Sequence, residues 1–185
     1  MRILSEKRVP SHSLVPYVVT AAAVSAAAVA GAAAVDPDST WYRRLAKPAF
    51  QPPPRAFGAV WPPLYASIAW AGGHALHQAT GRRRRAPAAA LGANLALNTA
   101  WNWLFFRAQS PKAGLVGTLL IDLSNLVLIR RTADVDRAGA WALLPYAGWC
   151  GFATALNAAI VKRNPALHRH SGASIAAVRC VVRAP

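Results

Sequence analysis

The sequence contains few acidic residues and few cysteines. Of its 185 residues, 6 are Asp or Glu, against 21 Lys and Arg, and charged residues make up 15% of the chain. The two cysteines, Cys150 and Cys180, are too few for a disulfide framework and lack metal-ligand spacing. The chain also has no pairing of a nucleophile with a base, no phosphate loop and no metal-ligand cluster. No catalytic residue, metal ligand or required cofactor is therefore assigned.

Long uncharged runs dominate the chain. Hydrophobic residues make up 55% of it, so the protein either buries nearly all of them or is solvated by lipid. Crossing a bilayer takes about 20 apolar residues. Four uncharged runs reach that length and a fifth, slightly shorter, carries one acid, Asp122; in chain order they are 14–35, 56–81, 86–106, 113–129 (with the acid) and 138–161. The sequence predicts an all-α integral membrane protein with a bundle of five transmembrane helices.

The five runs leave no room for a soluble domain. We expect a basic N-terminal segment over residues 1–13, a membrane domain over 14–164 and a basic polar tail over 165–185. The first run resembles a signal peptide in its flanking cations, but it exceeds a usual signal core, so we interpret it as a retained helix. Its stripe of small residues, Ala23, Ala27 and Gly31, suits either packing within the bundle or a dimer seam.

The formal net charge of +15 would suggest a nucleic-acid partner if the protein were soluble. Here the cations occupy the short segments between the apolar runs, as in the cluster 82–85. Those positions meet lipid phosphates, so we expect a lipid bilayer and no nucleic acid as partner. The cations are divided almost evenly between alternate segments, which leaves the membrane orientation open.

Residues 41–65, WYRRLAKPAFQPPPRAFGAVWPPLY, form a long first loop and the start of the second run. The prolines at 48 and 52–54 predict an extended connection that does not continue a helix. Trp41, Tyr42 and Trp61 have an apolar body and a polar edge, which suits a membrane surface. A loop of this length in a compact protein is often a lid or a binding element.

Two runs present amides and indoles on one helical face. In the third run these residues are Asn94, Asn98, Trp101 and Phe105; in the last run they are Tyr146, Trp149 and Asn157. Amides in hydrocarbon need partners, so these faces point into the bundle, where they bond to another helix or face a ligand. The indoles beside Ala and Gly would form an apolar slot for a flat ring system.

Three ionisable side chains lie inside the predicted spans. Asp122 is either a functional residue or a structural one that bonds to an asparagine of the third run or lies near the interface. His74 and His77 are three residues apart near a basic helix end, which favours an interfacial position over ligation of a haem iron.

Several motifs in this order resemble the translocator protein family, also called tryptophan-rich sensory proteins or peripheral benzodiazepine receptor-like proteins. The resemblance covers about residues 14–164. It rests on Trp41-Tyr42, Lys47-Pro48-x-Phe50-x-Pro52-Pro53, the VWPPLY sequence of 60–65, Asn98-x-x-Trp101 with Leu104-Phe105-Phe106, and Pro145-Tyr146-x-x-Trp149 followed by Phe152-Ala153-Thr154-x-Leu156-Asn157.

The resemblance implies five transmembrane helices, a homodimer and a pocket near one membrane face, covered by the first loop. It implies binding of porphyrins such as protoporphyrin IX and haem, with sterols and benzodiazepine-type drugs as ligands of some relatives. The pocket residues that carry over are Trp61, Tyr65, Asn98, Trp101, Trp149 and Asn157, with Phe57 as a loop contact that covers the pocket.

The chain departs from the family pattern at the lid. Phe50 replaces a frequent Trp, and Arg55 replaces an aromatic residue, so Arg55 would offer a cation to a porphyrin carboxylate. Trp41, Phe50 and Arg55 are thus the expected lid residues. The sterol motif of animal relatives needs a Tyr where this chain has Ala158, so sterol recognition is not expected.

These observations predict a membrane protein that binds tetrapyrroles and acts in porphyrin sensing, trafficking or disposal. Ring stacking on Trp101 and Trp149, with orientation by Asn98 and Asn157, would supply the binding. Two alternatives stay open: an enzyme that promotes light- and oxygen-dependent porphyrin breakdown, and a transporter of small hydrophobic ligands. The richness in alanine and arginine favours a bacterial cytoplasmic membrane.

Overall fold

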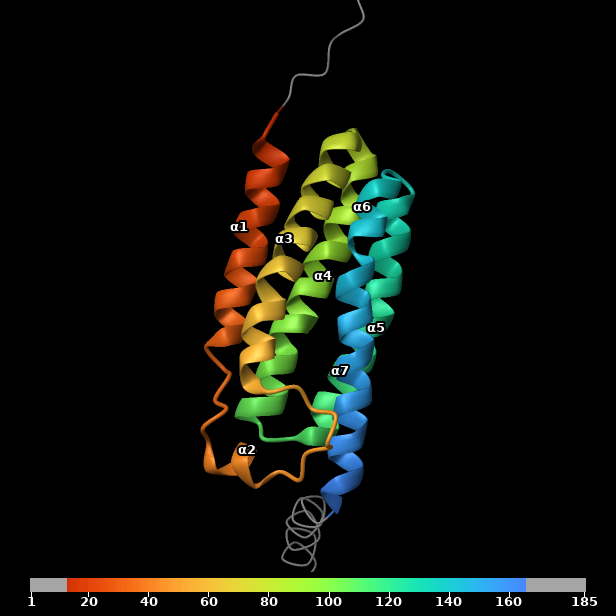
Figure 1. Cartoon of the computed structure of the whole chain (residues 1–185). Helices are drawn as coiled ribbons and strands as arrows, with labels where there is room; N and C mark the ends of the chain where they lie inside the picture. The colour runs from red at the N-terminus through yellow and green to blue at the C-terminus, as the bar shows by residue number, and fades with distance from the viewer. Residues whose placement is uncertain (1–12, 166–185) are drawn as a thin grey trace, which may run out of the picture.

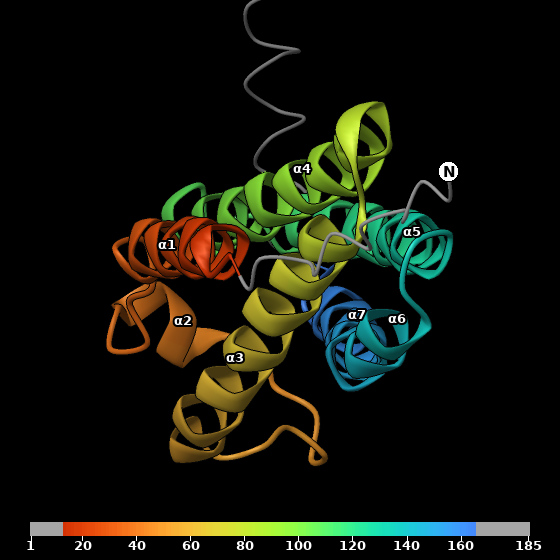
Figure 2. The ribbon, with the colours of Figure 1, turned by 90° about the horizontal axis from the view of Figure 1, so that it is seen from above.

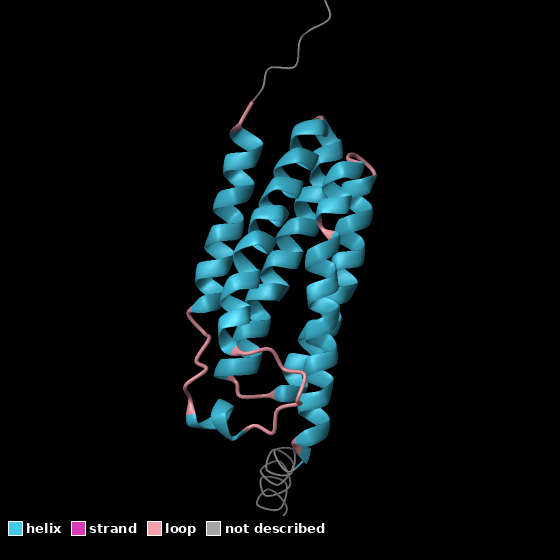
Figure 3. Ribbon diagram, viewed as in Figure 1, coloured by secondary structure: helices cyan, strands magenta, loops and turns pink. Residues whose placement is uncertain are grey.

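Five long helices run side by side in the computed structural model, which describes residues 13–165 (Figure 1). They are α1 (Val15–Ala32), α3 (Pro54–Gln78), α4 (Arg85–Asn102), α5 (Pro111–Ala133) and α7 (Leu144–Arg163). Two short helices, α2 (Thr40–Arg44) and α6 (Arg137–Ala142), lie at opposite ends of the bundle. Within the described residues the fold is all-helical and no strand occurs (Figure 3).

The helices are arranged so that α1 and α5 lie on opposite sides, with α3 and α4 between them and α7 beside α5 (Figure 2). The first loop and α2 close the end that is lowest in Figure 1. The short connections, including the 3₁₀ turn Gly81–Arg84, close the other end. We call these the loop end and the short-turn end.

Prolines and small polar residues determine where the helices begin. Pro54 and Pro111 stand at the first positions of α3 and α5, where a missing N–H costs nothing. Ser39, Ser110 and Asp136 each accept a hydrogen bond from a backbone N–H in the first turn of α2, α5 and α6, respectively. These caps keep the connecting segments short and defined.

The structure corrects two boundaries predicted from the sequence. The extended connection ends at Pro53, because Pro54 starts a helix, so Arg55 and Phe57 lie in the first turns of α3 and not in the loop. The last predicted span, 138–161, is not one uninterrupted helix: it is divided at Leu143 into α6 and α7, and Pro145 stands in the first turn of α7.

Three segments are long and apolar enough to cross a membrane: Val15–Ala32, Pro111–Ala133 and Arg137–Arg163, the last comprising α6 and α7. Helix α3 has sufficient length but carries Pro62 and Pro63 in its interior and two histidines near its end. The count of five spans therefore stays a prediction. Outward-facing aliphatic side chains, such as Val18 and Val19 on α1 and Leu123 on α5, are exposed as a lipid-facing surface requires.

A group of buried polar side chains joins three helices at the middle of the bundle. The Nδ2 of Asn94 donates to the Oδ1 of Asn125 at 2.7 Å, and Asn94 accepts a hydrogen bond from the Tyr146 hydroxyl at 2.9 Å. Asn98 donates to the same hydroxyl at 3.1 Å. We call Asn94, Asn98, Asn125 and Tyr146 the central amide cluster. It connects α4 to α5 and α7, as the inward amides of the third run predicted.

Helix α1 packs against α3 and α4 through close contacts with small residues. The Thr99 hydroxyl donates to the Ala27 carbonyl at 3.2 Å, and a Cβ at Gly31 would lie 2.8 Å from the Asn102 amide nitrogen. Ala27 and Gly31 thus pack within the bundle, while Ala23 is exposed. Only part of the small-residue stripe is used inside this chain.

Asp122 and His74 form hydrogen bonds with other helices, whereas His77 has a ring contact with Tyr17. Asp122 accepts a hydrogen bond from the Thr154 hydroxyl of α7 at 2.6 Å, so its partner is not an asparagine of α4. His74 bonds through Nδ1 to the Tyr17 hydroxyl at 2.7 Å and stacks on Trp70. No group of three metal-ligating side chains occurs in residues 13–165. The predicted N-terminal segment and tail lie almost wholly outside those residues.

Candidate ligand-binding site

Two cavities adjoin at the loop end of the bundle. The larger has a volume of about 350 Å³ and is lined by residues of α1, the first loop, α3, α4 with the turn after it, and α7. The smaller is a slot of about 60 Å³ between α3, α4, α5 and α7. Phe57, Trp61 and Trp101 line both, so these three rings form the wall that the cavities share.

The first loop covers the larger cavity and is held at both sides. On one side Trp41 meets the Phe105 ring edge-on at 5.5 Å between centroids, and Leu45 is buried against the same cluster. On the other side the amide of Asn164 accepts from the Ala46 N–H at 2.9 Å and donates to the Ala46 carbonyl at 3.0 Å. The loop is therefore fixed to the end of α7 as well as to α4.

A π-helical turn, Trp103–Arg107, follows α4 and shapes the larger cavity. The wider turn places Phe105 and Phe106 on the cavity wall. Phe105 stacks on Trp101 with 5.3 Å between ring centroids and an interplanar angle of 16°. Such turns are often found at functional sites. One face of Trp101 is thus already covered by Phe105, and its Nε1 donates to the Gly114 carbonyl at 3.0 Å.

The two candidate asparagines differ in what they have free to offer a ligand. Asn98 donates to the Tyr146 hydroxyl and belongs to the central amide cluster. Asn157 is almost fully buried and donates to the Ala153 carbonyl of its own helix, but its Oδ1 has no hydrogen-bond partner among the described residues. The same holds for the Oε1 of Gln51. Both oxygens belong to residues that line the larger cavity.

Tyr42 and Lys47 bring polar chemistry to the loop side of the cavity. The Lys47 ammonium lies 4.1 Å from the centre of the Tyr42 ring, and Tyr42 lines the larger cavity. Burial raises the pKa of the Tyr42 phenol, an effect that the hydrogen bond from Gln51 partly opposes. The phenol therefore stays neutral at physiological pH, and the cation beside it is the Lys47 ammonium.

The residues predicted from sequence are distributed between the cavities and their surroundings. Phe57, Trp61, Asn98, Trp101 and Trp149 line the slot, and Asn157 lines the larger cavity. Tyr65 lines neither; it stacks on Trp61 at 5.0 Å. Among the expected lid residues, Trp41 packs on Phe105 and Phe50 on Phe152, whereas Arg55 is exposed on α3, and none of the three lines a cavity.

Sequence reasoning missed other residues that line the cavities. The sequence assigns no role to Gln51 or Cys150 and predicts only a membrane-surface position for Tyr42. Gln51 and Tyr42 nevertheless line the larger cavity, and Cys150 lines the slot. A polar Gln between prolines was the available signal for Gln51. For Cys150, the spacing from Tyr146 and Trp149 placed it next to the inward face of the last run.

Comparison with known proteins supports the resemblance found in the motifs. A family model described as the TspO/MBR family matches residues 14–163. The chain is 37% identical over 131 residues to the tryptophan-rich protein TspO of Archaeoglobus fulgidus, covering 68% of this chain and 80% of the relative. It is 33% identical to the protein of the same name from Chlorobaculum tepidum, covering 70% and 82%. The translocator protein of Homo sapiens is 32% identical, with coverage of 67% and 75%.

Proposed function

This chain belongs to the TspO/MBR family of membrane proteins, and from that premise we propose that it binds a tetrapyrrole, of the class of protoporphyrin IX or haem, in the cavities under the first loop. The observation that carries the proposal is the shared wall of Phe57, Trp61 and Trp101 between the two cavities. Its rings offer a flat, apolar surface of the kind that a conjugated macrocycle stacks on. The larger cavity, at about 350 Å³, lies within the usual range of about 300–1,000 Å³ for ligand pockets.

In this proposal the macrocycle occupies the larger cavity and inserts one edge into the slot. The slot alone, at about 60 Å³, is too small for the whole ring. Phe105 covers one face of Trp101 and Tyr65 covers one face of Trp61, so stacking on either indole uses the face that these rings leave uncovered, and Phe57 supplies the third ring. Trp149 meets Phe57 edge-on at 5.7 Å and closes the slot at its far side.

The polar groups around the larger cavity support a ligand with acidic substituents. Lys47 provides a cation at the loop side, where it can pair with a carboxylate. The oxygens of Asn157 and Gln51 that lack partners accept hydrogen bonds from a protonated carboxyl, a ring N–H or a bound water. In this proposal Lys47, and not Arg55, is the cation that pairs with a carboxylate, because Arg55 is exposed in the first turn of α3.

We also propose that all five long helices cross the membrane, as a homodimer in a bacterial cytoplasmic membrane. Helices α3 and α4 lie alongside the three segments that meet the length and hydropathy requirements for a span. The central amide cluster satisfies the polar groups that α4 carries inward, which lowers the cost of placing that helix in lipid.

A titration of the purified protein with protoporphyrin IX, followed by fluorescence quenching, tests the binding proposal. Phe57→Ala should weaken binding about tenfold, which corresponds to about 1.4 kcal/mol, because it removes a shared wall of both cavities. Phe50→Ala is the matched control: Phe50 is another phenylalanine of the 41–65 segment, 52% exposed and outside both cavities. Equal affinities of the parent and Phe57→Ala would contradict the proposal.

A further inference from the structure

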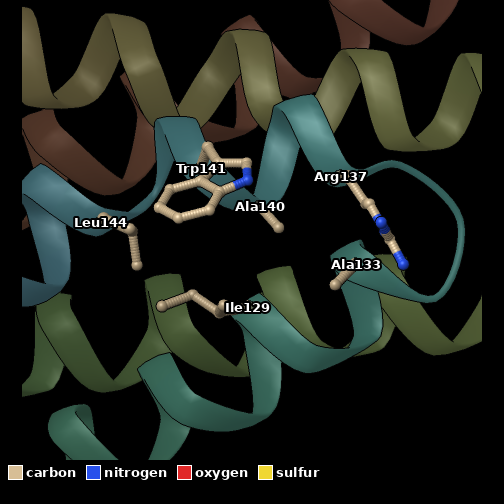
Figure 4. Close-up of a pocket in the computed structure, with 6 residues that line it drawn as sticks. All are labelled: Ile129, Ala133, Arg137, Ala140, Trp141 and Leu144. Atoms are coloured by element: carbon tan, nitrogen blue, oxygen red, sulfur yellow. The ribbon is translucent and has the colours of Figure 1, made fainter.

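A groove opens on the outside of the bundle at the short-turn end, far from the loop-covered cavities. It runs between the last turns of α5 and the short helix α6 (Figure 4). Its volume is about 390 Å³. Five of its six lining residues are apolar and the sixth is a cation; they are Ile129, Ala133, Arg137, Ala140, Trp141 and Leu144. The proposed function does not use any of them.

The local sequence explains why the groove exists. Asp136 caps α6 through the N–H groups of Ala138 and Gly139, which turns the chain sharply back along α5. Ala133 and Ala140 face each other across the gap with side chains too small to fill it (Figure 4). Trp141, 71% exposed, forms the outer wall on α6.

The groove runs along α6 and is long enough for part of an acyl chain. Arg137 and Ala133 lie at the end of the groove beside the turn between α5 and α6, and Leu144 and Ile129 lie toward its other end (Figure 4). From Arg137 to Leu144 the chain advances seven residues, or roughly 10 Å at the helical rise of about 1.5 Å per residue. The exposed indole of Trp141 lies between these ends, as amphipathic rings do near the boundary of a bilayer.

Charge distinguishes one end of the groove from the other. Arg137 is exposed, and no hydrogen bond or ion pair engages its side chain among residues 13–165. The nearby carboxylate of Asp136 is occupied by the α6 cap and lies 3.9 Å from His74. Arg130, in the last turn of α5, adds positive charge at the same end, whereas Arg131 is paired with Asp134 at 3.9 Å. A cation at the mouth of an apolar groove complements an anionic head group with a hydrocarbon tail.

We propose that this groove binds an anionic phospholipid, with the phosphate on Arg137 and one acyl chain along Ile129, Ala140 and Leu144. A guanidinium pairs well with a phosphate through parallel N–H groups. A sterol would leave Arg137 without a partner. A second copy of this strongly basic chain would bring like charge to the same end. The site is independent of the tetrapyrrole proposal, because no residue lines both.

Native mass spectrometry of the full-length protein in detergent tests the proposal. The protein is mixed with phosphatidylglycerol or phosphatidylcholine with identical acyl chains, and the retained lipid is counted. The parent should retain phosphatidylglycerol preferentially, and Arg137→Gln should lower its affinity for that lipid about fivefold, which matches the worth of one cation at a lipid surface. Ala133→Leu, which fills the groove, should lower retention of both lipids.

Two matched control variants make the same changes in charge and bulk outside the groove. Arg163→Gln removes a cation at the other end of the bundle, and Ala138→Leu adds the same bulk at an exposed position outside the groove. Both should behave like the parent, and circular dichroism checks that all variants remain helical. Equal retention of the two lipids by the parent, or unchanged retention by Ala133→Leu, would overturn the proposal. So would a dimer that Ala133→Leu dissociates, because the occupant would then be a second copy.

Discussion

The two ends of the bundle are built in opposite ways. At the loop end the helices are separated by two cavities, and two side-chain oxygens without partners lie there. At the short-turn end α1 is in direct contact with α3: a Cβ on Gly73 would lie 2.9 Å from the Tyr17 Cα, and Tyr17 bonds to His74. The comparison indicates that the short-turn end holds the helices in place while the loop end keeps room for a ligand.

The central amide cluster separates these two regions. Tyr146 is 1% exposed; its hydroxyl donates a hydrogen bond to Asn94 and accepts one from Asn98. Asn98 also lines the slot, so the floor of the candidate site includes a side chain that is held in place by its hydrogen bond to Tyr146.

The strongest test of the comparison is Gly73→Ala at the short-turn end. The new methyl group would clash with the backbone of Tyr17, which cannot move without shifting α1. We expect a loss of about 2–3 kcal/mol in the free energy of unfolding, the upper part of the usual range of about 1–3 kcal/mol for overpacking. Thermal unfolding in detergent measures it. Gly148→Ala is the control, because no atom lies within 4 Å of the added Cβ, and a similar loss there would contradict the explanation.

Asn94→Ala tests the boundary between the two regions and should have the next largest effect. The change removes the partner of Asn125 and one partner of Tyr146, leaving buried polar groups unsatisfied. Each such group costs about 1–3 kcal/mol, although hydrogen bonds between membrane helices average less, so we expect a loss of about 2 kcal/mol in the free energy of unfolding. Asn102→Ala, whose amide bonds only to its own helix, should lose less than half as much.

Gly114→Ala sharpens the comparison because it creates a similar clash at the loop end. The added Cβ would lie 2.6 Å from the Phe105 ring and 3.0 Å from the Asn157 oxygen. Both are side chains on the wall of the larger cavity, so they can shift into empty space. We expect a loss below about 1 kcal/mol in the free energy of unfolding. Affinity for protoporphyrin IX should nevertheless fall severalfold, because the displaced groups occupy the cavity; an unchanged affinity would argue against this site.

The sequence predicted helix ends well where charged residues mark them. It predicted them poorly where a proline or a local break in the backbone sets them. Uncharged runs located all five long helices, and helical spacing placed Asn98, Trp101 and Trp149 on inward faces. The sequence pattern did not show that Pro54 starts a helix, so it did not predict that Arg55 and Phe57 lie in α3 rather than in the loop. Nor did it show the break at Leu143, because an apolar run continues on both sides of it.

Within the candidate site, spacing gave the direction of a side chain but not its partners. Asn98 and Asn157 look equivalent in sequence, yet Asn98 donates across the bundle to Tyr146, whereas Asn157 donates to its own helix and keeps a buried acceptor without a partner. Tyr65 lies one turn from Trp61 and stacks on it, but it lines neither cavity. Which residues pair in this way depends on contacts between helices distant in the chain, and a single sequence does not contain that information.

The paired hydrogen bonds between Asn164 and Ala46 have a practical consequence for choosing a C-terminal boundary. A shortened chain that stops at Arg163 would keep every long helix complete. It would nevertheless lose both hydrogen bonds between the first loop and the end of α7, because both come from the side chain of Asn164. Crystallisation or labelling work that trims the tail should therefore retain Asn164, because its side chain holds Ala46 of the first loop to the end of α7.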